Sequence, residues 1–288
     1  MINNQTELKG ILPVNKPTSW TSFDVCNKLK HLLKTSKIGH LGTLDPMASG
    51  VLLVTVGKAT KLFDLFQEKH KTYVAKFKFG YSTDTLDATG TTLSENGKIP
   101  TESEIAKALP KFIGEISQIP PQYSAKSVNG KRAYDLARVG KTVDLKPCKV
   151  KIFNLEVIAY QNAELTLKIE CGSGTYIRAL GRDIATELGT FATMTELTRA
   201  QVGNFTLEQC INQNMFDENV GKNLVCIKDA LKLPVLNLNE VEKGKLLNGQ
   251  IIKTEQNDGY YHVLGKTDSI AIAKISNFNA KMCIFLGL

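Results

Sequence analysis

The chain has 288 residues, of which 42% are hydrophobic and 22% are charged, so it can fold around a full core and form more than one domain. Its formal net charge of +8 favours a polyanionic partner such as nucleic acid. The first ten residues lack the basic and apolar regions of a secretory signal, and the longest apolar run, residues 51–56, is too short to cross a bilayer. We therefore expect a cytoplasmic protein that is not attached to a membrane.

In the first ninety residues, the patterns predict strands and helices in alternation. A Thr-Ser-Phe-Asp start signal opens a helix over residues 21–34, with Phe23, Cys26, Leu29 and Leu33 at helical spacing. Strict alternation over residues 72–81 predicts a strand with one buried side, formed by Tyr73, Ala75, Phe77, Phe79 and Tyr81. The other elements expected here are a strand over 11–14, a Gly-rich loop over 37–50, a strand over 51–56 and a short helix over 58–66.

The rest of the chain divides into a mixed part and a β-rich part. We expect helices over 102–112 and 131–139, a strand pair over 149–159 and 164–171, and a helix over 175–188. Gly189 closes that last helix. From about residue 236 the pattern changes to one short helix followed by short strands, which predicts a small β-rich domain.

Several motifs that would indicate a cofactor or a metal are incomplete. Residues 172–177, GSGTYI, start like a dinucleotide fingerprint but lack its third glycine. Residues 57–60, GKAT, lack the Ser or Thr of a phosphate loop. The six cysteines contain no C-x-x-C pair, and His40 and Asp45 have no further histidine near them, which is poor metal geometry. We therefore expect free thiols, no cofactor and no metal.

The Gly-rich loop, KIGHLGTLDPMASG, carries one carboxylate, Asp45. Asp45 could cap a short helix that begins at Pro46, a common use of Asp-Pro. Gly50 would end such a helix after one turn, however. In the alternative, the glycines let the backbone approach a ligand closely and present Asp45 to it.

Arginine is scarce in this chain. Only five of the 36 basic residues are arginines, and all five lie between Arg132 and Arg199. Where lysine is so dominant, a retained arginine can indicate a place that needs a planar, bidentate donor. Arg178 and Arg182 lie four residues apart, so they share one face of the helix expected there.

The loop around Asp45 resembles the catalytic loop of the TruB family of tRNA pseudouridine synthases. Leu41 departs from the family pattern, in which a small or hydroxyl residue is more usual at this position. We expect that difference to affect loop packing or RNA contact but not the chemistry. Four further blocks resemble this family in the same order: NKPTSWTS (15–22), KTYVAKFKFGYSTDTLDATG (71–90), QIPPQYSAKSVNGKRAYDLARVG (118–140) and CGSGTYIRALGRDIATELG (171–189).

The resemblance implies an α+β fold of the pseudouridine-synthase type, with a mixed, mainly antiparallel sheet and flanking helices. It implies three parts: a catalytic domain over 1–210, a helical connector over 211–235 and a PUA-like RNA-binding module over 236–288. The implied reaction isomerises uridine to pseudouridine at position 55 in the T-loop of tRNA, by base flipping and without a cofactor. We expect a monomer whose partner is tRNA.

The resemblance also assigns the chemistry to three residues. Asp45 would be the catalytic carboxylate, acting as nucleophile or as base at the sugar. Arg178 would pair with Asp45 and keep it ionised, whereas without the family it would be taken for an exposed helix-face arginine. Tyr73 would stack on the target base, the alternative being that it is simply part of the strand core.

Further residues would contact the RNA. His40 would help to displace stacked bases so that the uridine can flip out, although a lone loop histidine is usually just solvated. The lysines would contact phosphates. The alternative is that they only keep the protein soluble, as exposed lysines in general do. The residues expected to bind RNA are His40, Lys16, Lys61, Lys126, Arg132 and Tyr176.

A second function remains open beside the enzyme. The chain could be a tRNA-binding protein whose useful act is to open and reclose the tRNA elbow. The set of Asp45, Tyr73 and Arg178 favours the enzyme, because a protein kept only for binding would not need it. A glycosidase with a pair of carboxylates is a remote third option, since the motif has no convincing second acid near Asp45.

Overall fold

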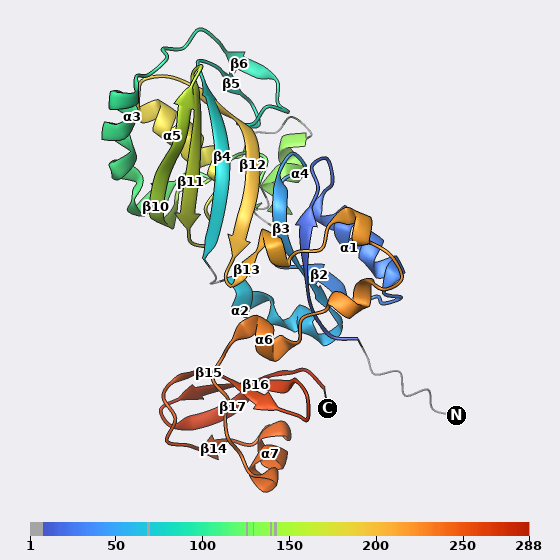
Figure 1. The fold of residues 1–288 in the computed structure, drawn as a ribbon. Helices are drawn as coiled ribbons and strands as arrows, with labels where there is room; N and C mark the ends of the chain where they lie inside the picture. Colours follow the sequence, from blue (N-terminus) through green and yellow to red (C-terminus); the bar gives the residue numbers. More distant parts are fainter. Residues whose placement is uncertain are drawn as a thin grey trace. The chain divides into compact units, whose positions relative to one another are not determined.

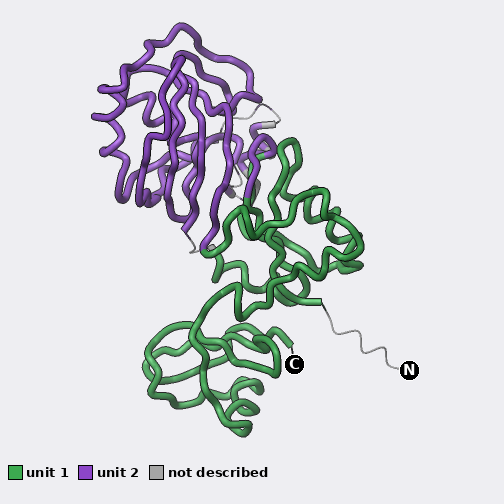
Figure 2. Tube along the Cα trace, viewed as in Figure 1, with its two compact units in different colours: residues 1–45, 51–67, 204–288 green, residues 46–50, 68–203 purple. Residues whose placement is uncertain are grey.

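The computed structural model describes residues 8–67, 70–124, 126–128, 130–138, 140 and 143–287. The chain forms two compact units, and each contains segments that are distant in sequence (Figure 2). Unit 1 consists of Met1–Asp45, Val51–Gln67 and Asn204–Leu288. Unit 2 consists of Pro46–Gly50 and Glu68–Gly203.

Unit 2 is built on an antiparallel sheet in the order β12-β4-β11-β10-β7 (Figure 1). The first two residues of β3, Ser49 and Gly50, add a short parallel pairing to β12. Two small strand pairs, β5 with β6 and β8 with β9, complete the strands that the structure describes in this unit. The elements are β4 (Lys71–Phe79), β5 (Ser82–Thr83), β6 (Thr92–Ser94), α3 (Glu102–Ala108), η2 (Leu109–Phe112), β7 (Gly114–Gln118), β8 (Ser127–Val128), β9 (Lys131–Arg132), α4 (Ala133–Arg138), β10 (Cys148–Gln161), β11 (Glu164–Cys171), α5 (Ile177–Glu187) and β12 (Ala192–Val202).

Helix α5 packs closely on the sheet of unit 2. The buried face of β4 carries Tyr73, Ala75, Phe77 and Phe79, as the alternation predicts. A Cβ at Gly181 of α5 would lie 2.3 Å from the Phe77 ring, so only glycine allows the helix to lie this near the strand. This close packing determines where the first turn of α5 lies relative to β4.

The N-terminal part of unit 1 contains the helix and strands that precede and follow the Gly-rich loop. Thr21 and Asp24 form a capping box at the start of α1, which confirms the predicted start signal. β3 pairs with β1 and with β2. The elements are β1 (Gly10–Lys16), α1 (Ser22–Leu32), β2 (Ile38–His40), β3 (Ser49–Val56), η1 (Gly57–Leu62) and α2 (Phe63–Gln67).

The C-terminal part of unit 1 contains a small sheet in the order β14-β17-β16-β15. Its own apolar core includes Leu246, Tyr261 and Ile275. The predicted β-rich segment after residue 236 is therefore present. The elements of this part are β13 (Phe205–Thr206), η3 (Leu207–Gln209), η4 (Gln213–Met215), η5 (Val220–Asn223), α6 (Ile227–Leu231), α7 (Glu240–Leu247), β14 (Ile252–Lys253), β15 (Gly259–Leu264), β16 (Ser269–Ser276) and β17 (Asn279–Phe285).

Some predictions of secondary structure and burial were wrong. Phe23 is 71% exposed and does not share the buried face of α1. Tyr81 lies beyond the end of β4 and is only partly buried. The helix expected over 131–139 begins at Ala133, because Lys131 and Arg132 form β9. Among the described residues, no helix is long and apolar enough to cross a membrane.

Candidate active site

Asp45 lies in the loop that leads from β2 to β3. The β2–β3 ladder ends where the Leu41 N–H donates to the Leu53 carbonyl at 2.8 Å. All residues from 41 to 48 are described, none of them is helical, and Pro46 and Met47 form a turn. The alternative in which Asp45 caps a helix is therefore wrong. The half-buried carboxylate stands on a non-helical loop between two strands.

The far end of this loop is held in unit 2 by β12. Gly50 pairs with Arg199 and Ser49 with Thr198, and the hydroxyl groups of Ser49 and Thr198 are 3.0 Å apart. Gly50 has φ of +111°, and a Cβ there would lie 2.3 Å from the Arg199 carbonyl oxygen. Glycine is thus required at this position both by the backbone conformation and by the close approach of β12. This explains one of the three loop glycines.

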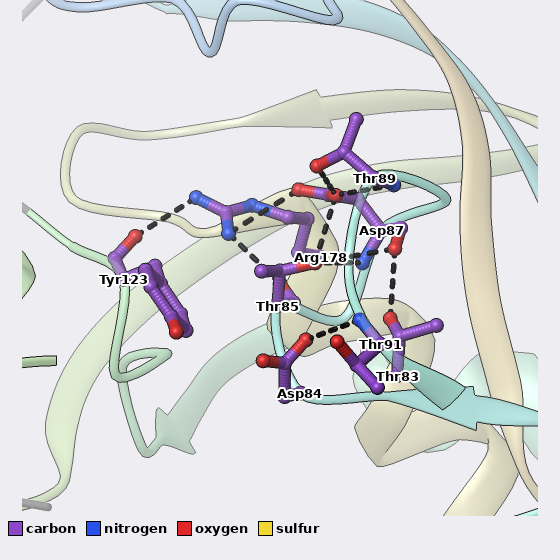
Figure 3. A network of polar contacts seen from close by, with 8 residues as sticks. All are labelled: Thr83, Asp84, Thr85, Asp87, Thr89, Thr91, Tyr123 and Arg178. Carbon is purple, nitrogen blue, oxygen red and sulfur yellow. Dashed lines mark hydrogen bonds and ion pairs between the residues drawn. The ribbon is translucent and has the colours of Figure 1, made fainter. Parts of the chain in front are cut away.

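Arg178 is the second residue of α5, and its side chain is only 7% exposed. Its Nη1 donates to the Thr85 carbonyl at 2.8 Å, and its Nη2 donates to the Tyr123 carbonyl at 3.0 Å. An ion pair joins Nη1 to Oδ2 of Asp87 at 3.5 Å (Figure 3). The alternative of an exposed helix-face arginine is therefore wrong. The pairing of Arg178 with Asp45 stays a prediction.

Asp87 is enclosed by threonines of its own turn. Its Oδ1 accepts from the Thr85 hydroxyl at 2.9 Å, from the Thr89 N–H at 3.0 Å and from the Thr89 hydroxyl at 2.6 Å (Figure 3). The Thr83 hydroxyl donates to the Asp87 carbonyl at 2.7 Å. These bonds leave Oδ2 facing the guanidinium of Arg178. We conclude that the turn serves to hold one carboxylate against a buried arginine.

Sequence reasoning missed Asp87. The segment that contains it resembles an acidic turn of the family, but no role was assigned to this residue. The local signal that could have found it is an Asp flanked by Thr85 and Thr89, because side-chain bonds over two residues are typical of Asx and Ser/Thr turns. The contact with Arg178, which is 91 positions further along the chain, has no such local signal.

Tyr73 lies on β4 and is 7% exposed. It stands opposite Arg199 of β12 on one side and opposite Ile169 of β11 on the other. This position at the start of the strand's buried face agrees with the strand core that the alternation predicts. The role of Tyr73 against a target base stays a prediction.

Cys171 of β11 and Lys71 of β4 stand opposite each other in the sheet. Burial raises the pKa of Cys171 to about 11, so this thiol is protonated at neutral pH and is a poor nucleophile. Burial lowers the pKa of Lys71, and the nearby guanidinium of Arg199 lowers it further. Lys71 Nζ donates to the Ser173 hydroxyl at 3.2 Å.

Lys16 was expected to contact RNA, but it lies in the interior of the structure. The side chain is completely buried, and its Nζ donates to the carbonyls of Pro17 at 2.8 Å and Trp20 at 2.6 Å. A buried ammonium in this arrangement holds the turn before α1 and presents no surface to a phosphate. We therefore correct the expected RNA contact of Lys16 to a structural role.

The other residues expected to bind RNA lie on several elements. His40 ends β2 and is half-buried, and Tyr176 is the residue before α5, with its N–H donating to Gln118 Oε1 at 2.8 Å. Lys61 is exposed on η1, and its Nζ donates to the Phe285 carbonyl at 3.2 Å. Lys126 is also exposed. The backbone of Arg132 lies in β9, but its side chain is outside the described part of the structure.

The fold of this chain is similar to that of two solved complexes that contain Cbf5. In the structure of the archaeal box H/ACA sRNP Nop10-Cbf5 complex, the matched chain is aligned over 86% of its length with 97% of this chain. The TM-score is 0.72 at 20% identity. A Cbf5-Nop10-Gar1 complex matches 96% of this chain and 84% of its own, with a TM-score of 0.71 at 23% identity. The expected α+β fold is thereby confirmed.

Residues 30–177 match the family described as TruB family pseudouridylate synthase (N terminal domain). A protein of Fusobacterium nucleatum is 40% identical over 94% of this chain and 97% of its own length. A protein of Clostridium perfringens is 39% identical over 98% of this chain and 94% of its own, and both are named tRNA pseudouridine synthase B. The chain belongs to the TruB family of pseudouridylate synthases.

Proposed function

We propose that this chain converts uridine to pseudouridine at position 55 in the T-loop of tRNA. The observation that carries the proposal is that the chain aligns over nearly its whole length with relatives named tRNA pseudouridine synthase B. The non-helical loop that presents Asp45 supports it, because such a loop can bring a carboxylate to a ligand. The excess of positive charge suits a tRNA partner.

The proposed reaction breaks the N1–C1′ bond of uridine, turns the base and joins C5 to C1′. C5 then loses a proton and N1 gains one, so no atom is added or removed overall and the chemistry needs no cofactor. Asp45 acts as nucleophile or as base at the sugar, and both roles require the ionised carboxylate. Arg178 pairs with Asp45 and keeps it charged, and Tyr73 stacks on the target base.

RNA binding is proposed for Lys61, Lys126, His40, Tyr176 and Arg132, which the resemblance assigns to this task. Lys61 and Lys126 are exposed and can neutralise phosphates. His40 would help to displace stacked bases, and Tyr176 and Arg132 would contact the RNA near the target. A division into a catalytic domain over 1–210, a connector over 211–235 and an RNA-binding module over 236–288 belongs to the same proposal. So do a monomeric state and a cytoplasmic location.

The test uses one unmodified tRNA transcript and a matched transcript with cytidine at position 55. The wild-type chain should form one pseudouridine in the first transcript and none in the second. Asp45→Asn is nearly isosteric, so it should keep tRNA affinity within about twofold, yet its single-turnover rate should fall by at least about 10⁴-fold. A variant that binds normally and still reacts would refute the role of Asp45. Pseudouridine at another position would refute the proposed target.

A further inference from the structure

The hydroxyl of Ser22 makes two hydrogen bonds to the backbone of Leu44. The Leu44 N–H donates to Ser22 Oγ at 2.9 Å, and Ser22 Oγ donates to the Leu44 carbonyl at 3.2 Å. Ser22 is the first residue of α1 and is 2% exposed, and the Leu44 side chain is 3% exposed. One buried side chain thus satisfies both backbone groups of a loop residue 22 positions away, as a strand neighbour would.

Leu44 immediately precedes Asp45. The β2–β3 ladder ends at Leu41, and the φ of +94° at Gly42 turns the chain out of the strand conformation. The bonds to Ser22 therefore give the loop a firm backbone support three residues after the ladder ends. On the other side of Asp45, Pro46 disfavours the helical region for the residue before it. The backbone of Asp45 is thereby constrained from both sides.

Ser22 is not needed to cap its own helix. Thr21 performs that task, because its hydroxyl accepts from the Asp24 N–H at 3.0 Å and its N–H donates to the Asp24 carboxylate at 2.8 Å. The hydroxyl of Ser22 is instead directed at the loop. Neighbouring residues of one helix start thus have separable tasks, which offers a matched control.

We infer that Ser22 is a positioning residue, which holds the Leu44 backbone so that the carboxylate of Asp45 stands at the reacting sugar. This inference rests on the proposed function, since it takes Asp45 as the reacting carboxylate. A reacting group must be held in one geometry, and a displacement of about 1 Å can lower a rate on the order of 100-fold. A carboxylate on a loop achieves this only where its backbone is fixed.

The experiment compares Ser22→Ala with Thr21→Ala in the full chain. Ser22→Ala removes both bonds to Leu44, and we expect its single-turnover rate at saturating tRNA to fall about 10- to 100-fold, with tRNA affinity within about twofold of wild type. Thr21→Ala weakens the same helix without touching the loop. Its rate should therefore stay within about twofold of the wild-type rate, even if its melting temperature falls as much as that of Ser22→Ala or more. Ser22→Cys keeps a weakly hydrogen-bonding atom of similar size, so its single-turnover rate should lie between those of the wild type and Ser22→Ala.

Hydrogen exchange at the Leu44 amide reports the contact directly. We expect exchange to be at least about tenfold faster in Ser22→Ala than in the wild type, and unchanged in Thr21→Ala. If Ser22→Ala does not fold, Ser22→Cys takes its place in both measurements.

Three results would overturn the inference. The first is a wild-type rate in the Ser22 variant, and the second is unchanged hydrogen exchange at its Leu44 amide. The third is a loss of rate in Thr21→Ala equal to that in the Ser22 variant at matched stability. Asp45→Asn, measured beside these variants, separates this inference from the proposed function. An active Asp45→Asn refutes the function, whereas an inactive Asp45→Asn beside a fully active Ser22→Ala refutes only the role of Ser22.

Discussion

Asp87→Asn tests whether the threonine-lined turn exists to hold Arg178. The substitution keeps an oxygen that can accept from Thr85 and Thr89, so the turn itself should persist. In place of Oδ2, however, it puts an NH₂ group 3.5 Å from the Nη1 of Arg178. Two donors then face each other, and the buried guanidinium loses the carboxylate of Asp87.

The size of the effect follows from the geometry. Two unit charges 3.5 Å apart interact by about 5 kcal/mol at an effective dielectric constant of roughly 20. Breaking a buried pair by removing one partner costs about 3–5 kcal/mol. Arg178 keeps its bonds to two backbone carbonyls, so we expect a loss of about 2–4 kcal/mol in the free energy of unfolding. At roughly 3 °C per kcal/mol, the melting temperature should fall by about 6–12 °C.

The catalytic rate should also fall, because the guanidinium of Arg178 would no longer be held in one position. If Arg178 orients the reacting carboxylate, the single-turnover rate at saturating tRNA should drop at least about tenfold, measured well below the melting temperature. Asp84→Asn is the matched control, because Asp84 belongs to the same turn and its Oδ1 accepts from the Thr91 N–H at 2.8 Å. Asparagine can keep that bond. Equal stability and equal rate in the Asp84 and Asp87 variants would refute the reasoning.

Three further predictions concern single residues. Arg178→Lys should lower the single-turnover rate at least about tenfold, because an ammonium cannot hold two carbonyls and a carboxylate in fixed directions, and a full rate at saturating tRNA would contradict this. Gly181→Ala should lower the free energy of unfolding by about 1–2 kcal/mol, since its Cβ meets the Phe77 ring at 2.3 Å, and urea unfolding with no loss would disprove the close packing. His262 is completely buried and burial lowers its pKa, so the unfolded chain binds more protons and stability should fall as pH drops below about 6.5, by up to about 1.4 kcal/mol per pH unit. Urea unfolding between pH 7.5 and 5 measures how the free energy of unfolding changes with pH. This change should be smaller in His262→Gln than in the wild type, and an identical change would exclude His262 as the cause.

The burial of charged residues was not predictable from the sequence. Lys16, Asp87 and Arg178 belong to residue types that are mostly exposed, yet all three are buried here. Lys16 is satisfied by carbonyls within four residues, a contact that depends on the turn it closes. Arg178 bonds to Thr85, which is 93 positions earlier, so its burial depends on the arrangement of α5 against that turn.

Strand β12 also escaped prediction. Its register with β4 shifts at two places, between Met194 and Glu196 and between Arg199 and Gln201. Each irregularity changes which side chains face the core, so the sequence does not alternate regularly over Ala192–Val202. The strand exists because β4 provides a continuous partner, which is information that lies outside the segment itself.

By itself, the sequence determined the elements whose signals are local. The start of α1, the alternation of β4 and the strand pair β10–β11 depend on side chains within one element or between neighbours in the chain, and all three were predicted. It also determined the family, through five sequence blocks that resemble it in the same order, and residues 30–177 match the family. Only the tertiary structure decided that Ser22 supports the loop of Asp45 and that Asp87 holds Arg178. The physical reason is that a hydrogen bond depends on distance in space, and residues far apart in the chain come within 3–4 Å only after the sheets and helices have packed.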